Sequence, residues 1–112
     1  MQNRNKLIDL FIGNIATAIV HEILEKAIGD ENLRRYYDKE FRTSFAIAKK
    51  YREKINPADK PLKISDQTKI KKDIVLRVKK ELMIRIEKGY KNIEIGDIGI
   101  YADEALKKLK IK

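Results

Sequence analysis

The chain has 112 residues, of which 43% are hydrophobic and 38% charged, and its net charge is +9. This length suits one domain with a single core, and the regular apolar periodicity argues against disorder. The absence of cysteine excludes disulfides, thiolate zinc sites, iron–sulfur ligation and cysteine nucleophiles.

The positive charge lies outside the N-terminal segment. Residues 1–33 carry three Lys/Arg and five Asp/Glu, whereas residues 34–112 carry twenty-three and twelve. The nineteen lysines and eighteen isoleucines also give the chain a thermophile-like composition. The lysine content therefore has two explanations, a binding surface or a thermophilic surface, although ion-pair networks alone would not require so large an excess.

The first predicted helix spans about residues 6–28. Its apolar residues fall in pairs every four positions, so the stripe drifts by about 40° per repeat around a helix of 3.6 residues per turn. Apolar surface on more than one side is typical of a central helix or of an oligomer interface. Gly29 is expected to end this helix, and Asp30 to cap the next.

Polar residues interrupt this apolar stretch at six positions: Asp9, Asn14, His21, Glu22, Glu25 and Lys26. A membrane span needs roughly 20 predominantly apolar residues, and no signal peptide is apparent. We therefore expect a soluble, cytoplasmic chain that does not enter a membrane.

The second predicted helix spans residues 31–55 and separates apolar from basic residues. At 100° per residue its apolar side chains fall within an arc of about 180°. Its basic residues occupy the opposite arc: Arg35, Lys39, Arg42, Lys49 and Lys50. Asn56-Pro57 is expected to end the helix, because the residue before a proline disfavours the α conformation.

A third helix is predicted to run to about residue 88, capped by Ser65 or Asp66 and closed by Gly89. Its basic residues lie mostly opposite its apolar ones, although two acidic residues interrupt them. The lysines that could supplement the basic face of the second helix are Lys69, Lys72, Lys79 and Lys80.

Residues 90–96 alternate as a short strand would, but no partner strand is apparent, and an isolated strand is unstable. We expect an extended segment in which Ile93 and Ile95 anchor on the core, followed by a short helix capped by Asp97. The predicted fold is a single all-α domain over residues 1–112. It is a small bundle of three long helices plus a short C-terminal helix, arranged as two helical hairpins around the first helix.

The residues that could carry catalysis or bind a metal form no complete motif. His21 is the one histidine, and a zincin-type site needs a second at the right spacing, so we expect His21 to be partly exposed and paired with Glu25. Among seventeen acidic residues, chance carboxylate pairs carry little information, and no glycine-rich phosphate loop is present. The sequence therefore predicts no catalytic residue, metal or cofactor.

The tyrosines allow two interpretations. Tyr36, Tyr37 and Tyr51 lie toward the apolar side of the second helix, while Tyr90 lies beside a turn. Aromatic residues next to basic ones can stack on unpaired bases. At helical spacing they more often belong to a core or an interface, and that is the stronger expectation.

The segment FAIAKKYREKI, residues 45–55, ends a pair of predicted helices. This pair resembles the helical hairpin of the zinc-ribbon subunit of archaeal ribonuclease P. That family continues into a cysteine ribbon, which this chain lacks, and the resemblance covers under half the chain. No residue role is carried over from it.

The basic residues give the strongest functional signal. Lys and Arg side chains that neutralise phosphates release counterions and give affinity without sequence readout. We therefore expect a non-enzymatic module that binds nucleic acid, either RNA or a single strand, through backbone contacts. The expected contact residues are Arg35, Lys39, Arg42, Lys49, Lys50, Lys69, Lys72, Lys79 and Lys80. The alternative is an interaction or assembly protein, a homodimer joined through the first helix, without nucleic-acid binding.

Overall fold

A computed structural model describes residues 4–56 and 60–111. In order along the chain, the elements are α1 (Arg4–Ala27), α2 (Glu31–Ile55), α3 (Ile64–Glu87), the short 3₁₀ turn η1 (Ile95–Asp97) and α4 (Ile98–Lys108). No strand occurs among the described residues. The predicted small all-α bundle of three long helices and a short C-terminal helix is confirmed.

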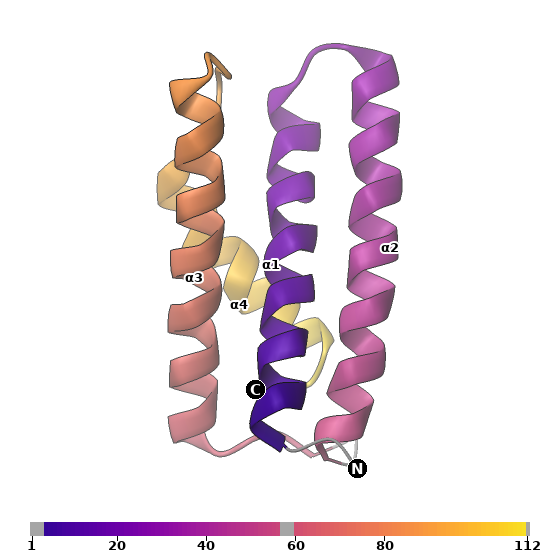
Figure 1. Cartoon of the computed structure of the whole chain (residues 1–112), viewed down its shortest axis with the longest axis vertical. Helices are drawn as coiled ribbons and strands as arrows, with labels where there is room; N and C mark the ends of the chain where they lie inside the picture. The colour runs from indigo at the N-terminus through magenta and orange to yellow at the C-terminus, as the bar shows by residue number, and fades with distance from the viewer. Residues whose placement is uncertain (1–3, 57–59, 112) are drawn as a thin grey trace.

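The three long helices lie side by side in one layer, with α1 in the middle (Figure 1). α1 and α2 form an antiparallel hairpin, and α3 packs on the other side of α1. α4 crosses obliquely behind this layer and packs on α3 and α1. α4, with 11 residues, is less than half as long as α3, with 24, so it covers only part of α3.

The apolar stripe of α1 is buried inside the fold. Ten of its residues are buried, and eight of them, all but Leu7 and Ala18, join one core with buried residues of α2, α3 and α4. The ten are Leu7, Phe11, Ile12, Ile15, Ala16, Ala18, Ile19, Val20, Ile23 and Leu24. Because the stripe drifts around the helix, α1 can contact neighbours on several sides at once. A central position for this helix was one of the two interpretations of its pattern.

By length and composition, α1 is the one helix among the described residues that could cross a membrane. The core helix of a globular protein has the same composition, and more than half of the most apolar part of α1 is buried within the fold. The finding is therefore weak evidence for a membrane span.

The start of α2 follows the prediction. Asp30 lies at the N-cap, and its Oδ1 accepts a hydrogen bond from the backbone N–H of Leu33 at 3.0 Å. Asp97 occupies the equivalent position before α4, but its side chain makes no capping hydrogen bond. Gly29 does not adopt the left-handed conformation expected of a glycine that ends a helix, whereas Gly89, with φ 99°, does so after α3.

The start of α3 corrects the prediction that Ser65 or Asp66 caps it. The helix begins earlier, at Ile64, with Lys63 at the N-cap and no side-chain capping bond. The Asp66 carboxylate instead pairs with Arg4 at the start of α1, at 2.9 Å. The local sequence around Asp66 gives no sign of this ion pair with α1, which takes the place of a capping bond.

The segment between α3 and α4 contains no strand and joins the core through two isoleucines. Ile93 and Ile95 are half-buried and pack against the core, as predicted. Between α3 and Ile93 the chain turns at Asn92, whose φ of 65° is left-handed and is tolerated by asparagine better than by most residues.

One buried cation ties together the end of the bundle where α2 and α4 finish. Arg52 is only 1% exposed. Its Nε donates to the carbonyl of Leu109 at 2.9 Å, and its Nη2 donates to the carbonyls of Lys60 at 2.7 Å and Lys110 at 2.9 Å. Its Nη1 donates to the backbone and side-chain oxygens of Asn56. We call these five residues the Arg52 joint.

The charge of Arg52 is balanced by helix ends. Among the described residues no carboxylate lies within ion-pair distance of its guanidinium. Asn56 is the C-cap of α2 and Leu109 is the C-cap of α4, so the cation lies at the negative ends of two helix dipoles. Burial lowers the pKa of Arg52, but an arginine remains protonated at any physiological pH. A buried positive charge therefore fastens α2, α4 and the segment that leads into α3.

Candidate nucleic-acid interface

The nine basic residues predicted to contact nucleic acid are all exposed, and they lie on two different helices. The α2 set consists of Arg35, Lys39, Arg42, Lys49 and Lys50, and the α3 set consists of Lys69, Lys72, Lys79 and Lys80. Because α1 lies between α2 and α3, the fold keeps the two sets apart on either side of the central helix (Figure 1).

The arginines and lysines of these sets differ in their pairing. Arg35 pairs with Glu31 at 2.9 Å and Arg42 with Asp38 at 2.8 Å, each one turn away on the same helix. None of the seven lysines, all of them within the described residues, is ion-paired. The lysines therefore present uncompensated charge to solvent.

The six ion pairs found among the described residues are separate from one another. No residue in this part of the chain belongs to two of them. Exposed single pairs of this kind contribute about 0–1 kcal/mol each. Thermophilic stabilisation by charge depends on networks, so this arrangement offers little support for that explanation of the lysine content.

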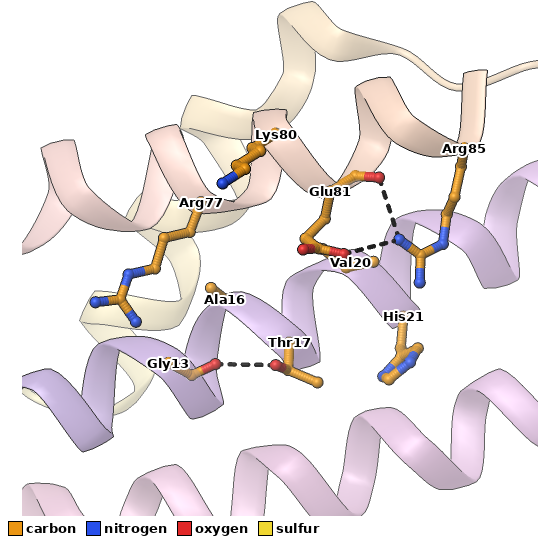
Figure 2. A pocket seen from close by; sticks show the side chains of 9 residues that line it. All are labelled: Gly13, Ala16, Thr17, Val20, His21, Arg77, Lys80, Glu81 and Arg85. Atoms are coloured by element: carbon orange, nitrogen blue, oxygen red, sulfur yellow. Dashed lines mark hydrogen bonds and ion pairs between the residues drawn. The ribbon is translucent and has the colours of Figure 1, made fainter. Parts of the chain in front are cut away.

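A groove of about 410 Å³ runs between α1 and α3 (Figure 2). Its lining comprises Gly13, Ala16, Thr17, Val20 and His21 from α1, with Arg77, Lys80, Glu81 and Arg85 from α3. We call it the α1–α3 groove. Three basic side chains and one acidic side chain, all from α3, line it, so the lining is net positive.

Gly13 allows a guanidinium to lie close to α1. A Cβ at this position would lie 3.3 Å from Nη1 of Arg77. Arg77 also pairs with Asp9 of α1 at 2.5 Å, and Arg85 pairs with Glu81 on its own helix at 3.3 Å. The lysine of this groove, Lys80, has no such partner and belongs to the α3 set as well.

Four rings gather at the end of the groove near the α1–α2 turn. The His21 ring stacks on Tyr37, with centroids 5.6 Å apart and an interplanar angle of 27°. Tyr36 meets the same Tyr37 edge-on, at 5.3 Å and 68°. Tyr90, from the turn after α3, lies close enough to Tyr37 to raise its pKa. We call His21, Tyr36, Tyr37 and Tyr90 the tyrosine cluster.

Of the three tyrosines at helical spacing, for which a core or an interface was expected, two lie against the core and Tyr36 does not. Tyr37 and Tyr51 are half-buried against the core, in agreement with that expectation. Tyr36, however, is 53% exposed and Tyr90 is 39% exposed. The apolar arc of α2 is wider than the surface that α1 and α4 cover, so its margin reaches solvent.

His21 is held by stacking. Among the described residues no hydrogen bond or ion pair joins it to Glu25, and its Nδ1 is buried without a hydrogen-bond partner. This corrects the expected His21–Glu25 pair, because the ring lies against Tyr37 of α2. Desolvation lowers the pKa of His21, so the ring is neutral at pH 7.

The charged neighbours of the tyrosine cluster act in opposite senses. Arg85 on α3 lowers the pKa of His21 further, whereas Glu40 on α2 opposes the shift. Burial raises the pKa of Tyr37, and its contact with Tyr90 adds to that rise. His21 and Tyr37 are therefore uncharged at neutral pH, and a positive charge beside them comes from Arg85.

The sequence did not identify the groove or its connection to the rings. His21, Tyr37 and Arg85 come from three helices, and only the packing of those helices brings them together. The described residues hold no group of three or more His, Asp or Glu side chains placed to bind a metal.

No protein-family model matches the chain, and no curated protein or solved structure matches it either. The resemblance of residues 45–55 to a ribonuclease P subunit gains nothing from these comparisons. A function for the chain must therefore be argued from its own surface.

Proposed function

We propose that the protein is a non-enzymatic nucleic-acid-binding module that holds RNA or a single strand through phosphate contacts. The observation that carries this proposal is the group of seven exposed lysines in the α2 and α3 sets that have no ion-pair partner among the described residues. Unpaired cations on a chain of net charge +9 favour a polyanion through counterion release.

The spacing of the lysines suits a nucleic-acid backbone. Lys39 and Lys50 are eleven residues apart on α2, or about 16 Å along a helix that rises 1.5 Å per residue. A stacked strand carries one phosphate per roughly 3.4 Å, so this length spans about five nucleotides. The α3 set offers a second line of charge on the far side of α1, so a bound strand can use either helix.

A salt titration tests the proposal. Fluorescence anisotropy with labelled single-stranded DNA and RNA is expected to give a linear fall of log K with log salt concentration. Replacing Lys39, Lys49 and Lys50 together with glutamine, or Lys69, Lys72 and Lys79 together, removes three charges each. On a single strand, each phosphate contact contributes about 0.7 to the magnitude of this slope. The loss of three contacts should therefore reduce the magnitude of the slope by up to about 2.

The matched control removes three lysines outside both sets: Lys91, Lys107 and Lys108. It lowers the net charge equally and should leave most of the slope in place. Failure of the wild type to bind any nucleic acid at low salt would contradict the proposal. An equal loss of slope in all three variants would mean that net charge, rather than the two sets, attracts the strand.

The alternative is a homodimer joined through α1, without nucleic-acid binding. This alternative was inferred from the wide apolar surface of α1. Ten residues of that surface are buried against the rest of the chain. Little apolar surface on α1 remains for a second copy, which favours the first proposal. Light scattering at micromolar concentration separates the two, because the dimer requires twice the mass of one chain.

A further inference from the structure

Tyr36 presents an aromatic ring to solvent from a supported position. The residue is 53% exposed, and the contact of its ring with Tyr37 is edge-on, at 5.3 Å and 68°. Tyr37 is in turn fixed by stacking on His21. An aromatic pair of this geometry is worth about 0.5–1.5 kcal/mol beyond its buried area, so the second ring helps to hold the first. Tyr36 is therefore a preorganised aromatic surface beside solvent.

The tyrosine cluster is continuous with the α1–α3 groove. His21 belongs to both, and Arg85 lines the groove while it acts electrostatically on His21 and Tyr37 (Figure 2). Lys80 and Arg77 follow along the same side of α3. From Arg85 to Arg77 is eight residues, or about 12 Å of helix. Three cations thus extend from the rings over the length of three to four stacked nucleotides; Arg77 and Arg85 are each paired with one carboxylate, and Lys80 has no ion-pair partner among the described residues.

This combination discriminates between paired and unpaired strands. Every base has a π-face that can stack on an aromatic side chain, but in a duplex those faces are already covered by neighbouring base pairs. A phosphate backbone, by contrast, is available in both forms. Cations alone would therefore accept either form, whereas a ring next to them favours unpaired bases.

We infer that the tyrosine cluster and the α1–α3 groove form one site for single-stranded nucleic acid. An unpaired base stacks on Tyr36, and the adjoining phosphates lie along Arg85, Lys80 and Arg77. This inference rests on the proposed nucleic-acid binding and narrows it to a site that senses the bases as well as the backbone.

The test measures the binding of two proteins, the wild type and one variant, to two ligands, a normal strand and an altered strand. A short labelled single strand is compared with a strand of equal length in which the bases are replaced by abasic residues, so that the phosphates are retained. Wild-type protein should bind the abasic strand about tenfold more weakly, as expected for the loss of one stacked base. Tyr36→Leu keeps an apolar side chain but removes the ring. It should weaken binding of the normal strand about tenfold and leave the abasic strand unchanged.

Tyr101→Leu is the matched control, because Tyr101 lies on α4 beside Lys26, away from the groove. It should leave both affinities unchanged. Tyrosine emission provides a second readout, since the chain has five tyrosines and no tryptophan. The normal strand should quench wild-type emission more than it quenches Tyr36→Leu, and thermal melting of both variants checks that the fold is intact.

The outcomes separate this inference from the proposed function. If the wild type binds neither strand at low salt, nucleic-acid binding itself fails and the stacking site fails with it. If the wild type binds both strands equally, with the steep salt dependence of phosphate contacts, the function stands and the stacking site is overturned. A Tyr36→Leu variant that still prefers the normal strand tenfold also overturns it.

Discussion

The two ends of the helical layer differ in how completely their buried polar groups are hydrogen-bonded. At one end Arg52 is almost fully buried, and each of its three guanidinium nitrogens donates to at least one oxygen. At the other end His21 keeps a buried nitrogen without a partner, and Tyr36 stays half exposed. A fully satisfied buried group serves the fold, because it has no bonding capacity left for a ligand. The incompletely covered end is the one that can accept a ligand.

The largest effect is expected from Arg52→Met, which removes the charge and all the guanidinium donors of the Arg52 joint and leaves only the bond from Asn56 Nδ2 to the carbonyl of Lys60. The carbonyls of Lys60, Leu109 and Lys110 lose this donor, and each buried unsatisfied group costs roughly 1–3 kcal/mol. We expect the free energy of unfolding to fall by about 3 kcal/mol or more, measured by urea denaturation followed by circular dichroism. The free energy of unfolding of Arg52→Lys should lie between those of the wild type and Arg52→Met, because lysine keeps the charge but lacks the planar guanidinium group.

Arg34→Met is the control for this change. It makes the same substitution on the same helix, but at an exposed position, where surface changes usually stay within about 0.5 kcal/mol. A similar small loss in Arg52→Met would remove the contrast between the two ends.

A smaller effect is expected at the ring-bearing end from Asp30→Ala. The side chain caps α2 through the N–H of Leu33, and losing such a cap typically costs about 1 kcal/mol. Thermal unfolding measures the change. Asp97→Ala provides the comparison, because Asp97 occupies an N-cap without a capping bond and its loss should cost less. Equal losses in both variants would show that the capping bond of Asp30 contributes little.

The smallest effect concerns the pH dependence from His21. Burial lowers its pKa below the usual 6.5, so just below that pH the unfolded chain binds more protons than the folded one. The free energy of unfolding should therefore fall as the pH drops from about 7.5 to about 5.5. His21→Gln should remove this part of the slope in urea midpoints measured over the same range. An unchanged slope in the variant would assign the pH dependence to other groups.

The sequence predicted the helices better than it predicted the contacts between them. The bounds of α2 follow from local signals, with Asp30 as a cap at one end and Asn56-Pro57 as a stop at the other. The sequence also carries a sign that Arg52 is buried. The position of Arg52 on the helical wheel, about 100° from Leu33, falls between Phe41 and Phe45 in the apolar arc. A cation that lies between two phenylalanines, inside an apolar arc, favours burial.

The partners of these residues were beyond the reach of local patterns. The acceptors of Arg52 at Leu109 and Lys110 lie 57 and 58 residues along the chain. The rings of His21 and Tyr37 meet through the alignment of α1 with α2, and Tyr90 joins them from the turn after α3. Periodicity places a residue on a face of its helix, but the relative shift of two helices depends on packing along their whole length.

The Arg52 joint also sets an order of events during synthesis. α1 and α2 are joined by a short turn, so they can pair while the ribosome is still making α3. The joint needs the carbonyls of Leu109 and Lys110, so it closes only after residue 110 has been added and has left the ribosome. Until then the nascent chain carries an arginine among apolar side chains without its final acceptors. The bonds of the Arg52 joint therefore form later in synthesis than the pairing of α1 with α2 can begin.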